Sequence, residues 1–167
     1  MMKGWHHEPY RHSLARRGIR TSNNFRARGE DRQETCADLV YPNFRSRMSD
    51  LFKLWDAYNS GEDEYVEDIG SLNEYGLSFD YVSPRTFDDD QKEGYFRYQI
   101  SWGGPSDEFR FYVGPGYELY KIEYRYMDWF DGASYTPGGK DYELLEEIYN
   151  WFNEIGVTEA EYEKSKE

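Results

Sequence analysis

Between residues 77 and 127, apolar and polar side chains alternate along the chain with a period of two. This period is typical of β-strands that bury one face and expose the other. Four runs show it, and their apolar positions are Leu77, Phe79 and Tyr81, then Phe96, Tyr98, Ile100 and Trp102, then Phe109, Phe111 and Val113, and finally Tyr120, Ile122, Tyr124 and Tyr126. Glycine and proline at positions 103–105 and 114–116 favour tight turns between neighbouring runs. The pattern therefore predicts a four-stranded antiparallel meander.

On both sides of this region the apolar spacing becomes three or four residues, which is the period of a helix with one buried face. The first helix is predicted over residues 45–59 and the second over residues 141–155. Gly61 and Gly156 provide natural ends. We expect an α+β fold in which the helices pack on one face of the sheet and the other face is at least partly open to water.

The charge is distributed unevenly along the chain. Residues 1–34 contain eight basic and four acidic residues, a net charge of +4, and show no hydrophobic periodicity. Residues 35–167 contain 12 basic and 29 acidic residues, a net charge of −17. We therefore predict a basic, extended or disordered arm over residues 1–34 and an acidic α+β domain over residues 35–167.

Several classes of protein are not indicated by this sequence. No run reaches the roughly 18 apolar residues that span a bilayer, and the N-terminus has no apolar stretch of the kind that a secretory signal needs. The single cysteine, Cys36, cannot form an internal disulfide. We expect a cytoplasmic protein without a membrane partner.

Motifs for catalysis and for cofactor binding are also lacking. All three histidines lie in the arm, and their spacing matches no structural zinc site. There is no glycine-rich phosphate loop or calcium loop. We expect no cofactor, no bound metal and no enzymatic activity. A small hydrolase with a carboxylate site is the third alternative behind two binding functions.

The leading hypothesis is a non-enzymatic protein that binds a basic protein surface, with its carboxylates imitating nucleic-acid phosphates. Three acidic patches are the candidate contacts: the helix face Glu143, Glu146, Glu147 and Glu154, the loop Asp88, Asp89 and Asp90, and the link Glu62, Asp63 and Glu64. The alternative reading is that these acids only keep the protein soluble. Seventeen tyrosines exceed what one small core can bury with every hydroxyl satisfied, so the open sheet face is then the candidate interface.

The second hypothesis places nucleic-acid binding in the arm. Arginine combined with aromatic residues suits a phosphate backbone with occasional base stacking. The candidate contacts are Arg11, Arg16, Arg17, Arg20, Arg26 and Arg28. A solubilising tail explains the same composition, and the acidic body would repel duplex phosphates.

Three segments carry a resemblance. Residues 75–81, 102–112 and 11–21 resemble parts of small uncharacterised acidic proteins of phages and other mobile elements. The resemblance implies no reaction, cofactor or catalytic residue. It implies a setting in which small acidic proteins antagonise host defence nuclease complexes, some of them by imitating the charge of DNA.

Overall fold

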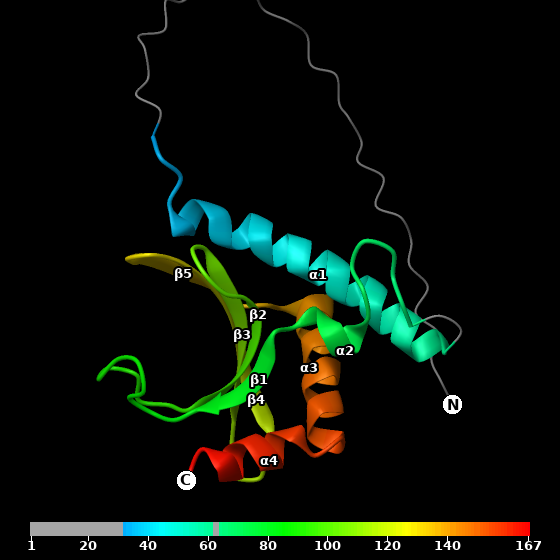
Figure 1. The fold of residues 1–167 in the computed structure, drawn as a ribbon. Helices are drawn as coiled ribbons and strands as arrows, with labels where there is room; N and C mark the ends of the chain where they lie inside the picture. Colours follow the sequence, from blue (N-terminus) through cyan, green and yellow to red (C-terminus); the bar gives the residue numbers. More distant parts are fainter. Residues whose placement is uncertain (1–31, 62–63) are drawn as a thin grey trace, which may run out of the picture. The chain divides into compact units, whose positions relative to one another are not determined.

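The computed structural model describes residues 32–61 and 64–167 of the chain, and Gln33–Glu167 forms one compact unit (Figure 1). It begins with two helices, α1 (Cys36–Ser60) and the single-turn α2 (Leu72–Tyr75). Five strands follow: β1 (Ser78–Val82), β2 (Tyr95–Ser101), β3 (Ser106–Val113), β4 (Leu119–Asp128) and β5 (Asp131–Tyr135). The chain ends with α3 (Gly139–Glu154) and α4 (Val157–Lys164).

The sheet is an antiparallel meander with the order β1-β2-β3-β4-β5. The predicted α+β class and the antiparallel sheet are confirmed, but the prediction of four strands is wrong because β5 is a fifth. Only Ala133 and Tyr135 of β5 pack against the core, whereas Gly132 and Ser134 are exposed. Two inward positions, one of them alanine, give too weak an alternation to identify a strand.

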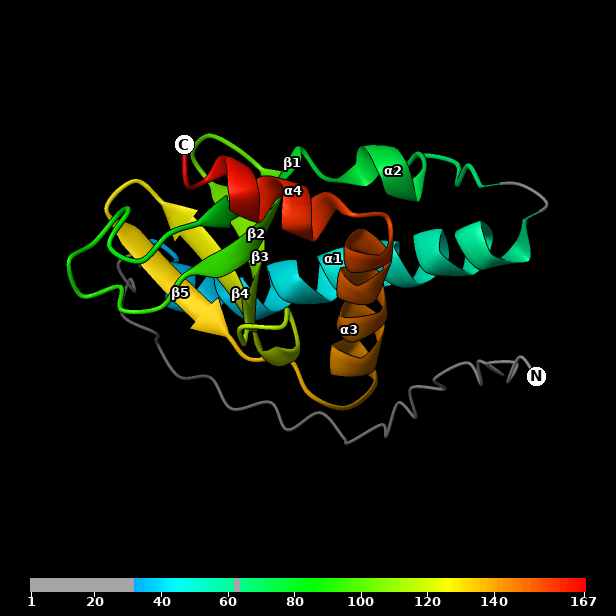
Figure 2. The same ribbon diagram turned by 90° about the horizontal axis from the view of Figure 1, so that it is seen from below.

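One face of the sheet is packed against the helices. Phe96, Phe109 and Phe111 have no exposed surface, and they meet Leu51 of α1 and Leu145 of α3 in one continuous core. Figures 1 and 2 show α1 and α3 on the same side of the sheet. The loop between β1 and β2 lies on the opposite side (Figure 1). The expected burial of one sheet face under helices is therefore observed.

Helix α1 begins at Cys36, nine residues before the predicted start at residue 45. Thr35 forms a capping box with Asp38, in which each side chain accepts a hydrogen bond from the backbone N–H of the other residue. The buried residues Val40 and Phe44 continue the helical spacing, although Pro42 lies inside the helix. Proline usually interrupts helices, which hid the first turns from the sequence pattern.

A buried ion pair joins α1 to the sheet. The Asp107 carboxylate of β3 is 1% exposed and accepts hydrogen bonds from Arg47 Nε (2.7 Å) and Nη2 (3.1 Å). It also accepts from the hydroxyls of Tyr124 (2.7 Å) and Ser101. Burial by itself lowers the pKa of Arg47, but the hydrogen bonds and the charge of Asp107 outweigh burial and raise it. The Arg47 guanidinium is therefore held in its charged form.

We expect Asp107→Asn to lower the free energy of unfolding by about 3 kcal/mol, because it leaves the Arg47 guanidinium without its counter-charge. This is the lower end of the range for buried pairs, since the Arg47 side chain is 28% exposed. Urea unfolding followed by circular dichroism measures the change. The control is Arg45→Gln, which breaks the exposed pair with Asp141 and should cost less than about 1 kcal/mol. Equal losses in both variants would contradict the role given to Asp107.

Candidate functional site

The sheet face opposite the helices is lined by charged side chains from neighbouring strands. Asp80 of β1 pairs with Arg97 of β2, Arg97 with Arg110 of β3, and Arg110 with Glu123 of β4. Two arginines therefore stand directly opposite each other in the middle of the sheet. Like charges in this position are destabilising unless other groups compensate them.

The compensation comes from carboxylates and from tyrosine rings. Arg97 donates to Asp80 from Nε (3.0 Å) and Nη2 (2.7 Å), and Arg110 Nε donates to Glu108 (2.7 Å). The Arg110 guanidinium lies 4.5 Å from the ring centroid of Tyr95. Burial, more than any neighbouring charge, raises the pKa of Tyr95 to about 12. The result is a charged floor with fixed side chains.

The loop between β1 and β2 converts this floor into a groove of about 920 Å³. Gln91 Nε2 braces the loop by donating to the carbonyls of Ser83 (3.0 Å) and Glu93 (3.1 Å). Glu93 in turn accepts from the Tyr120 hydroxyl at 2.6 Å and from Lys121 at 3.1 Å. A cleft of this size is in the range of small-molecule sites. Its lining is electrically balanced, with the basic Lys92, Arg97, Arg110 and Arg125 against the acidic Asp88, Asp90, Glu93 and Glu108.

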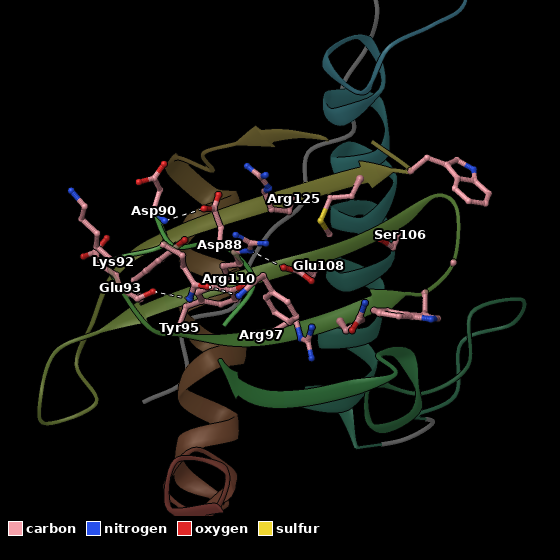
Figure 3. A pocket seen from close by; sticks show the side chains of 18 of the residues that line it. Asp88, Asp90, Lys92, Glu93, Tyr95, Arg97, Ser106, Glu108, Arg110 and Arg125 are labelled. Carbon is pink, nitrogen blue, oxygen red and sulfur yellow. Dashed lines mark hydrogen bonds and ion pairs between the residues drawn. The ribbon is translucent and has the colours of Figure 1, made fainter. Parts of the chain in front are cut away.

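Figure 3 shows Arg97, Arg110 and Arg125 on three neighbouring strands, with the loop residues Asp88 and Glu93 at one end of the floor and Ser106 at the other. The end at Ser106 is bordered by the loop between β2 and β3 and by the turn between β4 and β5.

Three large aromatic side chains at this end are exposed, and we call Trp102, Trp129 and Phe130 the aromatic rim. Their exposed fractions are 76%, 87% and 103%. The two connections that carry them are adjacent, because a Cβ added to Gly104 would lie 3.2 Å from Trp129 Nε1. Trp102 and Trp129 also line the groove. Adjacent exposed aromatic side chains are a typical mark of a binding surface.

The backbone of the rim is strained at one position. Trp129 has φ +50°, in the left-handed region that favours glycine. Asp128 and Asp131 pair with each other across the β4–β5 ladder, so Trp129 and Phe130 form a two-residue turn. A bulky residue in a position suited to glycine costs stability and is characteristic of functional sites.

The four glutamates of the predicted α3 patch differ in their exposure to solvent. Glu143 and Glu154 are exposed, whereas Glu146 and Glu147 are half-buried. Glu147 accepts a hydrogen bond from Trp55 Nε1 at 2.7 Å, so it packs α1 against α3. Two of the four residues are thus exposed to solvent.

The remaining acidic residues lie apart from α3. Asp88, Asp89 and Asp90 are exposed on the β1–β2 loop, on the opposite side of the sheet, and Asp88 accepts from the backbone N–H of Asp90 at 2.9 Å. Glu64 is exposed, and Glu62 and Asp63 lie outside the described residues. The structure therefore does not bring the loop and helix patches together.

Predictions for residues 1–31 also lie outside the described residues; they concern the arm, with its six candidate arginines and the three histidines. Within residues 32–61 and 64–167, no group of three or more His, Cys, Asp or Glu is placed to hold a metal ion. None of the helices in this part of the chain has the length and apolar character to span a bilayer.

The rim and the groove were not identified as a site from the sequence. The alternation placed Trp102 on the buried face, but the β2–β3 register shifts between Gln99 and Ser101, and β2 ends before Trp102. The turn residues Trp129 and Phe130 carried a usable signal, since two consecutive large aromatic residues between two aspartates are unusual for a hairpin turn.

Comparisons with protein-family models, with curated proteins and with solved structures find no significant match.

The rim turn is connected to the start of α1 through Asp131. Its Oδ2 accepts from the backbone N–H of Cys36 at 2.7 Å, and Oδ1 accepts from the N–H of Gly132 at 2.9 Å. The hydrogen bond from Cys36 is the main reason that the pKa of Asp131 is lowered. A lowered pKa in the folded state adds stability above the ordinary carboxyl pKa of about 3.9, and this stability is lost as the pH falls through the folded-state value.

We therefore expect Asp131→Asn to lower the melting temperature at pH 6, with the difference from the wild type shrinking as the pH falls below about 4. Thermal unfolding between pH 3 and pH 7 measures this difference. Asp89→Asn is the control, because Asp89 is exposed on a loop, and it should show little difference at any pH. A difference for Asp131→Asn that stays constant across the range would contradict the role of the carboxylate charge.

Proposed function

We propose that this protein is a non-enzymatic binding protein that contacts a partner protein through the aromatic rim. One observation carries the proposal: Trp129 is 87% exposed in a backbone conformation that favours glycine. Stability alone would favour a smaller, flexible residue at this turn. Exposed tryptophan that is retained at a cost in stability is best explained by contact with a partner, where it is among the strongest contributors to affinity.

The charge around the rim argues for a basic partner surface. Asp128 and Asp131 flank the two turn aromatics, and residues 35–167 have a net charge of −17. A basic surface with an apolar pocket would receive the aromatic side chains and neutralise the flanking carboxylates. Long-range attraction between such surfaces speeds association, and the aromatic contacts then slow dissociation.

We expect the double variant Trp129→Ala/Phe130→Ala to weaken partner binding by roughly 30-fold or more, the effect of losing one interface hot spot. Affinity capture with the full-length protein identifies the partner, and surface plasmon resonance with the purified partner measures the affinity. The control is Ile155→Ala, which removes an exposed apolar side chain at the end of α3. The proposal fails if the rim variant binds the partner as tightly as the wild type, or if the control weakens binding as much.

A second candidate function, imitation of nucleic-acid phosphates by α3, is favoured by a separate observation. Glu143 and Glu154 are exposed and form no ion pair within the described part of the chain. They lie on one 16-residue helix, so the backbone that carries their carboxylates is already ordered before binding. The resemblance to proteins of phages and mobile elements adds a host defence nuclease complex as a candidate partner.

If α3 imitates phosphate, Glu143→Lys/Glu154→Lys should slow association with a nucleic-acid-binding partner several-fold at low salt. The effect should fade at high salt, because screening shortens the reach of exposed charges. Stopped-flow kinetics at two salt concentrations measures it. Asp89→Lys/Glu64→Lys, with the same charge change on loops, is the matched control. Equal slowing by both pairs would indicate a general effect of net charge and exclude a specific role for α3.

A further inference from the structure

The floor of the groove contains a row of polar groups whose hydrogen-bonding capacity is only partly used. Gln99, Glu108 and Arg125 are cross-strand neighbours on β2, β3 and β4, and all three line the groove. Glu108 accepts from Arg110 through Oε1, and Gln99 donates through Nε2 to the carbonyl of Ser101. Within the described residues, the second Glu108 oxygen and the Gln99 amide oxygen have no donor.

Arg125, in contrast, has unused hydrogen-bond donors. Arg97 and Arg110 each form an ion pair with a carboxylate, whereas Arg125 forms none within the described residues. Its Nη1 donates to the Ser134 hydroxyl at 2.7 Å, and its Nε is buried without an acceptor in the part of the chain that the structure describes. The buried Nε is out of reach of a ligand, but Nη2 and the second Nη1 hydrogen form no hydrogen bond within the described residues. Arg125 lines the groove and therefore has N–H groups to spare for a ligand there. The row therefore presents one donor followed by two acceptors.

The same end of the groove offers flat apolar surfaces. Trp102, Trp129 and Met127 line it together with the polar row. Both indoles are largely exposed, so their faces are open to a flat ring. Proteins hold an unstacked nucleobase with aromatic side chains against the face of the ring and hydrogen-bonding groups along its edge.

We propose that this groove binds a nucleobase, with guanine as the base that fits best. The Watson–Crick edge of guanine presents one acceptor, O6, followed by two donors, N1–H and the 2-amino group. This order is complementary to Arg125, Glu108 and Gln99, and none of the other three common bases has it. Arginine is also the side chain that most often recognises guanine O6.

The charge of the groove suits a neutral ring better than a chain of phosphates. The lining carries four acidic and four basic side chains, so the base itself is not repelled. The surrounding domain has a net charge of −17 and opposes phosphate groups outside the groove. Recognition therefore falls on the base and not on the backbone that carries it.

This site goes beyond the proposed partner contact, and the two can be tested separately. Phe130 belongs to the rim and does not line the groove, whereas Gln99 lines the groove and is 5% exposed. Phe130→Ala should weaken partner binding and leave base binding unchanged. Gln99→Met should weaken base binding and leave partner binding unchanged.

Titration with nucleosides, followed by NMR of the tryptophan indole N–H signals, tests the proposal. Guanosine should shift the signals of Trp102 and Trp129, identified through Trp→Phe variants, and leave those of the helix residues Trp55 and Trp151 in place. Adenosine, cytidine and uridine should bind roughly tenfold or more weakly, because they leave polar groups of the floor unpaired. Inosine, which lacks the 2-amino group, should also bind more weakly than guanosine.

The variants separate recognition from stability. Gln99→Met should abolish the preference for guanosine over inosine, whereas Gln33→Met, at an exposed position before α1, should retain it. Arg125→Gln should weaken guanosine binding roughly tenfold, and Arg85→Gln, on the exposed β1–β2 loop, should not. Thermal unfolding checks that each variant is folded. The absence of shifts with any nucleoside, or a guanosine preference that survives Gln99→Met, would overturn the proposal.

Two further probes distinguish the sources of the base. Guanosine monophosphate and a short single-stranded oligonucleotide containing guanine are titrated under the same conditions. Binding of guanosine and its monophosphate without the oligonucleotide identifies a free nucleotide as the ligand. Binding of the oligonucleotide as well identifies single-stranded nucleic acid, and both results support a base-recognising groove.

Discussion

The position of α1 on the sheet depends on the buried ion pair between Arg47 and Asp107. Carboxylates that are 1% exposed are rare, and this one is tolerated because Arg47, Tyr124 and Ser101 all donate to it. The pair links α1 to β3 at one defined point, because two nitrogens of the Arg47 guanidinium donate to the same carboxylate. The next residue along β3 is Glu108, which points to the opposite face. A single strand therefore carries both the anchor of the core and the middle of the groove floor.

Because of this alternation, one face of β3 packs in the core and the other face lines the groove. Phe109 and Phe111 pack under the helices. Glu108 and Arg110, which alternate with them along β3, line the groove on the opposite face. Arg97 and Arg110 are held by ion pairs, and Arg110 also stacks on Tyr95, so these two side chains are ordered before anything binds. Binding to such a surface loses little side-chain entropy, which favours affinity. The arrangement suits a binding protein, whose selectivity comes from fixed groups on a rigid sheet.

Much of the fold could be predicted from local patterns, and most of the site could not. The period of two identified β1 to β4, and the period of three and four identified α1 and α3, because both reflect burial of one face. The capping box at Thr35 was a readable signal for the true start of α1. The row of Gln99, Glu108 and Arg125 depends on the register of three strands, including the irregularity after Gln99, and no local pattern reveals that register. Likewise, the sequence shows how many acidic residues there are. It does not show that Glu147 accepts a hydrogen bond from Trp55 and is therefore not part of the exposed acidic surface.

The two-residue turn at Trp129 and Phe130 restricts how this protein can change over evolution. Asp128 pairs with Asp131 on either side of it, and the register then continues inward to Tyr124 opposite Tyr135. An inserted residue that is not absorbed by a bulge would shift β5 by one position and move Ala133 and Tyr135 from the core to the solvent face. Loops of most binding proteins vary in length as well as in sequence. At this end of the sheet, the side chains at Trp129 and Phe130 can be exchanged without disturbing the core, whereas a change in the register of β5 disturbs it.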